Sequence, residues 1–540
     1  MKKLTFFAAF LMLSQIAFAG GLLTNTNQSA QFIRMMSRNA STGIDAVYFN
    51  PAGLIKMEDG WHFAVYNQTI FQTKPVDSEF PLLNDGAYEG VVNIPAFPTA
   101  FAVYKDDNWA FSLGFGPNGG GGSAEFERGL PSFEIPITKV VPGLAGLTQI
   151  DPSLDVTGYS ADLAFSGRSV FWGIQLGATY QFSDMLSVYG GVRYLPAKNS
   201  YQGSIQNIQL EVDGQGYPAP AWLLDVSGNL QNMGNMADQG ATSVQPIIDG
   251  GGGGYTLPEL EQAGMINSTQ RAEIEQGLVL VGAGNPDQLT VTQIQQTFVG
   301  ARDQLYGTAT QLDATAGQLG DKEVDTEQTG AGITPMIGFN FSPDDYWNFA
   351  VKYEMKTNLE LENNTTVDDL GLFPDGASSR NDLPAILGVG VGYSDESFEA
   401  QLSYNMYFNK GVDWGPNTRD IAASHPTVRD REIDKNGFEV GLGLQYNITD
   451  EFAFSVGGLY GDMGVADSYQ SDFSYSNPSV TAGAGIEWLI ADGLTLDAGF
   501  SNTFYQDQTV TFNDPDVGPY NETLGKTTMN FAVGLSYSLY

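Results

Sequence analysis

The stretch VFWGIQLGATYQF, residues 170 to 182, decides the fold because apolar side chains alternate with small or polar ones along its length. Successive side chains of a β-strand point to opposite faces, so a period of two predicts a strand. One face of the predicted strand carries glycine, glutamine and threonine, with Phe171 as the exception, and the opposite face is apolar. The apolar face consists of Val170, Trp172, Ile174, Leu176, Ala178, Tyr180 and Phe182.

Similar alternation recurs along the chain and predicts an all-β protein of fourteen strands. The predicted strands span about 61–74, 96–105, 108–116, 168–182, 186–204, 330–341, 347–361, 383–394, 398–408, 436–447, 452–461, 478–490, 493–504 and 526–540.

The connections between these segments favour a transmembrane barrel. Tight turns, such as 105–108 and 342–346, alternate strictly with long loops, such as 117–167 and 205–329. Bacterial outer-membrane barrels have an even number of strands, with short periplasmic turns and long extracellular loops. Closure also leaves no unpaired strand edge in the hydrocarbon. We therefore predict a 14-stranded antiparallel transmembrane β-barrel.

Aromatic residues gather beside the tight turns and support this interpretation. Trp and Tyr favour the headgroup level of a bilayer, so they predict a girdle at one interface. The residues concerned are Phe182, Phe341, Tyr346, Trp347, Phe398, Tyr446, Phe452 and Trp488.

Composition excludes several classes of protein. The 540 residues include 65 glycines and no cysteine, which excludes a disulfide framework and thiolate metal sites. A formal net charge of −38 is the opposite of the basic surface that nucleic-acid binders present, so no nucleic-acid partner is expected. Aromatic residues make up 12% of the chain, which argues against disorder.

The N-terminus predicts export. Residues 1–19 combine two lysines, an apolar run and Ala17-Phe18-Ala19, the pattern of a cleaved secretory signal peptide. The expected organisation is then a signal peptide at 1–19, a separate segment at 20–60 and a barrel at 61–540. A barrel in an exported chain predicts the outer membrane of a Gram-negative-type bacterium, with outer-membrane lipid around it.

Catalytic and metal sites find no support in the sequence. The two histidines, His62 and His425, stand in no recognisable motif. The string GVGVG at 388–392 lies in a predicted strand and is not followed by a helix, as a nucleotide fingerprint would be. We expect no enzyme activity, no cofactor and no metal. A barrel lipase would need a Ser-His pair in register, and His62 has no evident partner.

The stretch DAVYFNPAGLIKM, residues 45 to 57, holds an Asn-Pro turn just before the first predicted strand. Pro51 restricts the backbone of Asn50, and the Asn50 side chain can bond to nearby backbone, so a rigid turn is expected. Asn50, Pro51 and Ala52, followed by fourteen strands, resemble the long-chain fatty acid outer-membrane transporter family (FadL-type, with its toluene and xylene relatives). DDNWAFSLGFGPNGG (106–120) and NDLPAILGVGVGY (381–393) are similar to further parts of that family.

The resemblance covers essentially the whole mature chain and implies a function. It implies that 20–60 is a hatch folded inside the barrel, with the Asn50-Pro51-Ala52 motif in the part that seals the lumen. It implies that Leu22 and Leu23 enter the binding pocket as ligand contacts. It also implies passive uptake of hydrophobic molecules, with long-chain fatty acids first and aromatic hydrocarbons as an alternative.

Two other functions stay open. A polar-solute porin would have the same strands, but it predicts a lumen rich in Arg and Asp, whereas the inward faces here favour Gly, Ser, Thr and Gln. Surface adhesion by the long loops could coexist with transport.

The last predicted strand ends on Tyr540, which resembles the signal that the barrel-assembly machinery reads, although Tyr540 is out of phase with the apolar face.

The longest loop, 205–329, is predicted to contain helices. Apolar residues step by three and four from Val291 to Leu319, which is typical of an amphipathic helix. Thr290 with Gln293, and Thr256 with Glu259, form expected capping boxes. The helices are expected to form an extracellular lid, or to serve only packing or adhesion.

Gly116, Pro117 and Gly119 interrupt the third predicted strand and raise the hypothesis of a lateral opening. Proline cannot donate to a strand ladder, and glycine marks bulges and kinks. In the resembling family, a kink in the third strand forms such a window, through which ligand leaves sideways. The alternative is that 116–122 lies above the membrane and begins the long loop.

Overall fold

The computed structural model describes residues 27–282, 285–412, 414–416, 433, 435–467 and 469–539. The predicted signal peptide, Leu22, Leu23, His425 and Tyr540 lie outside the described residues. The chain divides into two compact units, and each is described by itself. A helical unit contains Lys139–Asp162 and Gln206–Asp321, and a barrel unit contains the other described residues.

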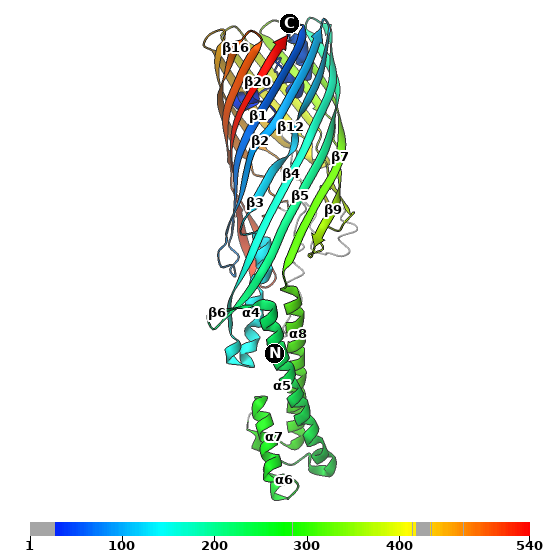
Figure 1. Ribbon diagram of the computed structural model, residues 1–540, viewed down its shortest axis with the longest axis vertical. Coiled ribbons are helices and arrows are strands. Elements are labelled where there is room, and N and C mark those ends of the chain that lie inside the picture. The colour runs from blue at the N-terminus through cyan, green and yellow to red at the C-terminus, as the bar shows by residue number, and fades with distance from the viewer. Residues whose placement is uncertain are drawn as a thin grey trace. The chain divides into compact units, whose positions relative to one another are not determined.

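The barrel unit is a closed, antiparallel sheet of fourteen long strands, as predicted. Each strand pairs with the next, and β20 pairs back onto β1 from Trp61 opposite Leu539 to Thr73 opposite Thr527 (Figure 1). The strands are β1 Gly60–Ser78, β2 Ala87–Asp106, β3 Trp109–Phe126, β4 Val156–Ser183, β5 Leu186–Val212, β7 Lys322–Phe341, β8 Trp347–Glu354, β11 Ile386–Ser394, β12 Phe398–Tyr407, β14 Gly437–Asn447, β15 Phe452–Asp462, β16 Ser479–Ala491, β17 Leu494–Tyr505 and β20 Thr527–Leu539.

Several expected loops are in fact strand, which corrects the predicted boundaries. The ends of β1 and β2 pair through most of 75–95, and β3 continues through 117–126. The predicted strand 347–361 is interrupted, since β8 ends at Glu354 and a separate strand follows. Strand ends that have polar residues on both faces lack the apolar alternation, so the pattern underestimates their length. The additional short strands are β6 Gln215–Pro218, β9 Glu360–Asp368, β10 Ser378–Asn381, β13 Trp414–Pro416, β18 Gln508–Asp514 and β19 Gly518–Leu524.

The two faces of the barrel wall differ as the alternation predicted. On β4, Leu176 is exposed on the outside, whereas Gln175 and Thr179 are buried. The outer face therefore carries the apolar side chains that a lipid-facing surface requires. Large aromatic side chains are also exposed beside the tight turns, at the end where β1 begins and β20 ends, namely Phe182, Phe341, Tyr346, Trp347, Tyr446 and Trp488.

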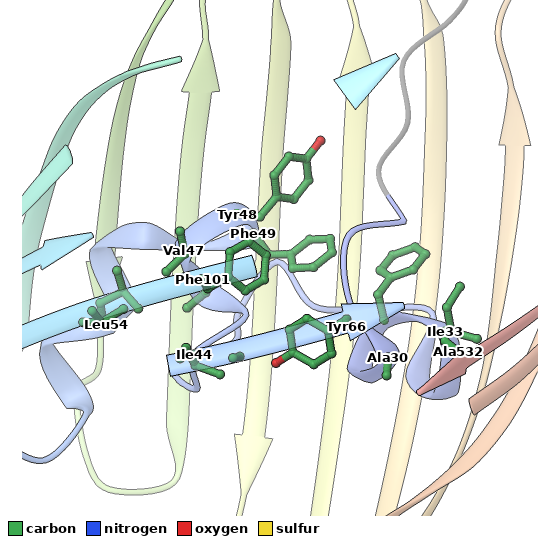
Figure 2. Close-up of a cluster of buried hydrophobic side chains, with 14 of the residues drawn as sticks. Ala30, Ile33, Ile44, Val47, Tyr48, Phe49, Leu54, Tyr66, Phe101 and Ala532 are labelled. Carbon is green, nitrogen blue, oxygen red and sulfur yellow. The ribbon is translucent and has the colours of Figure 1, made fainter. Parts of the chain in front are cut away.

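The N-terminal segment 27–57 lies within the barrel and packs on the inner face of its wall (Figures 1 and 2). It forms α1 Ala30–Met35, α2 Ala46–Phe49 and the 3-10 helix η3 Pro51–Lys56. Figure 2 shows Val47, Tyr48 and Phe49 beside Phe101 of β2 and Tyr66 of β1, in one buried apolar cluster.

The Asn-Pro turn expected at 50–51 is a junction between two helices. Asn50 ends α2 with extended φ of −141°, and Pro51 begins η3. Proline suits the first helical position because its missing N–H would have no partner there and its fixed φ is already helical. Both flanking helices are buried, except for Lys56 at the end of η3.

The remaining elements of the barrel unit lie in its long connections. The helix α3 Pro131–Thr138 follows β3, and the 3-10 turn η8 Asn409–Gly411 follows β12. The loop 463–478 joins β15 to β16 and is described except for residue 468.

The helical unit confirms the helices predicted for the longest loop. The helix expected from Val291 is α8 Val291–Gln318, and both predicted capping boxes are present, at Thr256 with Glu259 and at Thr290 with Gln293. Its apolar core includes Val244, Leu260 and Phe298. The other elements are α4 Val140–Leu144, η4 Ala145–Gln149, η5 Pro152–Leu154, α5 Ala219–Ile247, the π-helical turn η6 Ile248–Gly252, α6 Leu257–Gln262, α7 Ser268–Leu280 and η7 Pro286–Gln288.

No helix in the described part of the chain has both the length and the apolar character needed to cross a bilayer.

Candidate ligand-binding lumen

Arg34 anchors the N-terminal segment to β15, β16 and β17 of the barrel wall. Its guanidinium Nε donates to Asp497 Oδ1 on β17 at 3.0 Å, and one Nη donates to Glu487 on β16 at 2.6 Å. The other Nη donates to Ser455 Oγ on β15 at 3.0 Å. Gln31 Nε2 adds a bond of 2.6 Å to Asp497. Because Arg34 and Asp497 are fully buried, each depends on the other to compensate its lost hydration.

A second arginine shapes the segment itself. Arg38 forms a bidentate ion pair with Asp45, at 2.6 and 2.9 Å, which closes the turn between α1 and α2. It also pairs with Glu399 of β12 at 3.0 Å. Bidentate arginine–carboxylate pairs fix geometry as well as charge. The fold of the segment and its attachment to the wall therefore share one guanidinium.

The motif residues Asn50, Pro51 and Ala52 all contact the wall. Asn50 Nδ2 donates to Ser41 O at 2.9 Å and to Asn340 Oδ1 of β7 at 2.7 Å. The carbonyl of Pro51 accepts from Thr179 Oγ1 at 2.6 Å, and that of Ala52 accepts from Ser187 Oγ at 2.7 Å. The bond from Asn50 to nearby backbone was predicted, whereas its partner on β7 was not. The structure brings these three residues together at the barrel wall.

Inward-facing glycines let the segment approach the wall closely. A Cβ placed on Gly457, Gly441 or Gly390 would collide with backbone atoms of Met35, Met36 or Asn39. Larger side chains at these positions would push the segment away from the strands. The glycine-rich inner face seen in the sequence therefore makes room for the buried segment.

The lumen also holds more charge than the sequence suggested. Arg193 of β5 and Lys352 of β8 both pair with Glu354, at 2.6 and 2.8 Å. Their cationic groups lie 4.9 and 4.6 Å from the centre of the Tyr48 ring. The expectation of inner faces dominated by Gly, Ser, Thr and Gln was thus incomplete. Lys352 and Glu354 lie two residues apart in the sequence, but Arg193 and Tyr48 are distant from them, so the cluster as a whole could not be seen there.

Two adjoining cavities remain inside the barrel unit. The first, of about 270 Å³, is lined by Asn27 and Met36 of the N-terminal segment, by strand residues that include Gln72, and by Lys526, which lies between β19 and β20. The second, of about 190 Å³, shares Gln72 and Lys526 with it and extends to Lys74. We call the second space the lysine cavity. Both are of a size that accommodates part of an elongated ligand.

The lysine cavity combines cations with aromatic rings. Lys74 Nζ lies 5.1 Å from the Tyr475 ring centre and 5.9 Å from that of Phe126, and Lys526 Nζ lies 4.9 Å from that of Tyr505. No Asp or Glu is among the described residues that line this cavity, and neither lysine forms an ion pair with a described residue. A positive, aromatic-lined space of this kind suits a ligand with an anionic group and apolar carbon.

An apolar cleft adjoins the lysine cavity. It is nearly filled, with about 20 Å³ free. We call it the outer cleft. Its lining includes Phe133, Phe165, Tyr201, Leu372, Phe373 and Phe473.

Two buried acidic residues, Asp472 and Glu522, lie near the outer cleft. Burial raises the pKa of Asp472, which precedes Phe473. Burial, and then the charge of Asp472, raise the pKa of Glu522 well above its usual range. The two carboxyl groups therefore affect each other's ionisation.

The barrel wall is interrupted between β2 and β3. The two strands pair at Gly90 and Val91, and pairing resumes only at Ala100 opposite Phe115. On the other side of β3, the ladder with β4 shifts register between Pro117 and Gly119. The predicted Gly116, Pro117 and Gly119 therefore lie at this break. The segment covers it from inside, since Gln28 donates to the Pro117 carbonyl.

Pro95 and Pro98 mark the opposite edge of the break and were missed in the sequence. Both lie on β2 within the unpaired stretch. The signal was available, because two prolines three residues apart cannot both belong to a regular central strand. The cations of the lysine cavity were missed for another reason: Lys74 and Lys526 are 452 positions apart, and only closure of the barrel brings them together.

The level of the break can be judged from neighbouring strands. Asn93, inside the unpaired stretch of β2, lies opposite Phe71 of β1, and Phe71 lies opposite Met529 of β20. Both Phe71 and Met529 are exposed on the outer face. The break is therefore level with the outward apolar band. The strand β3 also runs on to Phe126, so 116–122 is not the start of a loop.

His62 has satisfied partners. One ring nitrogen lies 2.8 Å from Ser538 Oγ, and the other lies 2.9 Å from the Glu58 carbonyl. Both contacts are at the base of the barrel wall, away from the cavities. The prediction that His62 has no serine partner is therefore wrong, because closure of the barrel brings Ser538 of β20 beside it.

No protein-family model matches the chain, and no curated protein matches it. Solved structures do. A Pseudomonas aeruginosa FadL homologue is 12% identical and has a TM-score of 0.55, with 96% of this chain and 100% of that chain covered. The TodX deltaS2S3 mutant, described as a monoaromatic hydrocarbon channel, is 13% identical and has a TM-score of 0.52, with 95% and 99% covered. At such low identity the structural likeness shows the fold alone, and the chain therefore has the FadL-type barrel fold that the resemblance predicted.

Proposed function

We propose that the protein is a passive outer-membrane transporter of hydrophobic molecules that carry a carboxylate, with long-chain fatty acids first. The observation that carries this proposal is the lysine cavity, where Lys74 and Lys526 face a space without a described carboxylate in its lining. A fatty acid needs both a cation for its headgroup and apolar surface for its chain. The adjoining outer cleft supplies the apolar surface.

The N-terminal segment acts as the hatch in this proposal. A fourteen-stranded barrel is wider than side chains of the wall alone can fill, so an unblocked lumen would leak. The described segment lies inside the barrel and is anchored through Arg34, Arg38 and Asn50. Leu22 and Leu23 are the proposed ligand contacts. Asn27, a few residues later, already lines the first cavity.

The break between β2 and β3 is the proposed exit. Unpaired backbone groups at membrane depth are tolerated where protein or a water-filled cavity satisfies them. Gln28 satisfies the Pro117 carbonyl from the inside. Movement of the hatch would therefore uncover a gap in the wall, and ligand would leave sideways into the outer membrane.

Uptake of aromatic hydrocarbons is the second candidate. The outer cleft is lined mainly by apolar side chains, and once its lining rings move apart it would accept a neutral ring as readily as an acyl chain. The two candidates differ in their use of charge. A neutral aromatic ring gains only a weak cation–π attraction from the lysines, whereas a carboxylate gains an ion pair.

A binding assay on the purified full-length protein separates the candidates. Oleate, toluene and a sugar are titrated against the wild type and against Lys74→Gln/Lys526→Gln. The matched control is Lys198→Gln, which removes an exposed lysine that pairs with Glu327 away from the cavities. We expect the double variant to weaken oleate about tenfold or more, roughly 1.4 kcal/mol, and to leave toluene unchanged.

The other outcomes are equally informative. Binding of toluene but not oleate would establish the second candidate. Binding of the sugar alone would establish a polar-solute channel and refute both. Equal affinity of wild type and double variant for oleate would show that Lys74 and Lys526 do not hold the carboxylate.

A further inference from the structure

Three aromatic side chains, Phe165, Tyr201 and Phe473, separate the outer cleft from the lysine cavity. They are the residues that line both spaces. The ring centre of Phe473 lies 4.9 Å from that of Phe165 and 5.8 Å from that of Tyr201. Rings at these separations are in contact and leave no passage for an acyl chain.

Phe473 differs from the other two in its support. Phe165 lies on β4 opposite Phe126, and Tyr201 lies on β5 opposite Thr326, so both are held in the barrel wall. Phe473 lies in the loop 463–478, outside the strands of the wall. Its ring can therefore move without breaking a ladder. Gates are commonly built from loops carried on a rigid scaffold.

Asp472 determines where the backbone of Phe473 lies. Its Oδ1 accepts from the N–H of Phe473 at 2.8 Å, and its Oδ2 accepts from the N–H of Ser132 at 2.8 Å. Ser132 is in the first turn of α3, and the next residue, Phe133, packs edge-on against Phe165 at 5.5 Å. One buried carboxyl group thus ties the loop to the helix that supports the aromatic cluster.

We propose that Phe473 is the gate between the outer cleft and the lysine cavity, and that Asp472 is the positioning residue that holds it closed. The inference rests on the proposed uptake of fatty acids. During uptake, an acyl chain first enters the outer cleft by displacing the Phe473 ring. The carboxylate then reaches the lysines.

A gate has a kinetic signature that a binding contact lacks. Removing a gate raises the association rate and the dissociation rate of the ligand alike, because the gate stabilises neither the empty nor the ligand-bound cavity. Phe473→Ala should therefore raise the association and dissociation rates of oleate about tenfold and change its Kd by less than about threefold. A ring that merely lines the site would instead weaken binding through the dissociation rate.

The experiment is stopped-flow displacement of a fluorescent fatty acid by oleate from the full-length protein in detergent. The variants are Phe473→Ala, the smaller change Phe473→Leu, and Asp472→Asn. An amide offers one acceptor oxygen where the carboxylate offers two, so Asp472→Asn should loosen the loop and speed exchange with Phe473 intact. The control is Leu372→Ala, which enlarges the outer cleft and changes none of the three shared rings.

A locked gate gives the converse result. Phe473→Cys/Tyr201→Cys in this cysteine-free chain should slow oleate exchange below the wild-type rate when oxidised and recover it when reduced. Unchanged rates in the Phe473 variants, or an oxidised lock that exchanges as fast as the reduced form, would overturn the gate while leaving the proposed function standing. A wild type that binds no oleate would overturn both.

Discussion

Arg34 and Asp497 lie 463 residues apart in the chain, yet their side chains form a buried ion pair of 3.0 Å between Nε and Oδ1. The pair joins the first described helix to β17, near the end of the chain. It attaches the N-terminal segment to the barrel wall. The predictions about the hatch follow from this anchor.

We expect Arg34→Met to loosen the segment. It leaves Asp497 buried with fewer partners, and breaking a buried pair in this way costs about 3 kcal/mol. Conductance in planar bilayers should rise well above the low wild-type value. Arg34→Met/Asp497→Leu, which removes both charges, should bring the conductance back toward the wild-type value. A single variant that conducts no more than wild type would show that the pair does not retain the segment.

The junction at Asn50 and Pro51 gives a second prediction. Asn50→Ala removes the bonds to Ser41 and Asn340, about 1 kcal/mol each, and Pro51→Gly adds backbone freedom to the open state. Both should increase conductance, and deletion of residues 20 to 55 should increase it most. Asn108→Ala is the matched control, since Asn108 is exposed in the tight turn between β2 and β3 and its side chain donates to the adjacent Asp107. Equal conductance in the deletion and the wild type would refute the plug.

The lateral exit predicts that stapling β2 to β3 blocks transport. A Cβ on Gly116 would lie 3.0 Å from Thr99 Oγ1, so Thr99→Cys/Gly116→Cys can close the edge of the break that is nearest the tight turn between β2 and β3. Oxidised protein should take up fatty acid into vesicles far more slowly than reduced protein. The control pair Phe101→Cys/Gly114→Cys staples the same strands where they already pair. Uptake that is insensitive to oxidation of the first pair would exclude this exit.

The buried acids of the loop 463–478 predict a pH dependence. Burial raises the pKa of Asp472 and of Glu522, and the charged or titratable groups around them include Tyr475 and Lys74. A carboxyl whose folded-state pKa is raised contributes its full stability below the unfolded-state pKa and loses it as pH rises through the folded-state pKa. Amide protection in this loop should therefore fall as pH rises.

Hydrogen exchange, corrected for the intrinsic pH effect, measures that protection. Glu522→Gln removes the neighbouring charge and keeps both bonds of Asp472, so it should flatten the pH dependence. Protection that is constant with pH in the wild type would refute the coupling.

The number of strands, their order and the barrel class were predictable from residues such as Leu176 and Gln175, because alternation is a local property of the chain. The helix from Val291 and its Thr290 cap were predictable for the same reason. Local patterns lose their signal where both faces of a strand are polar, so the ends of β1, β2 and β3 were missed.

The sequence by itself also indicated the break in β3, because Pro117 lacks a backbone N–H and cannot donate to a strand ladder in any fold. It could not determine the lysine cavity, the Arg34–Asp497 pair or the contact of Asp472 with Ser132. Each of these joins residues that lie hundreds of positions apart, and barrel closure, the buried segment and the long loops decide which of them meet. Charges so distant in sequence acquire partners only when tertiary structure removes them from water, and the cost of leaving them unpaired then selects the arrangement.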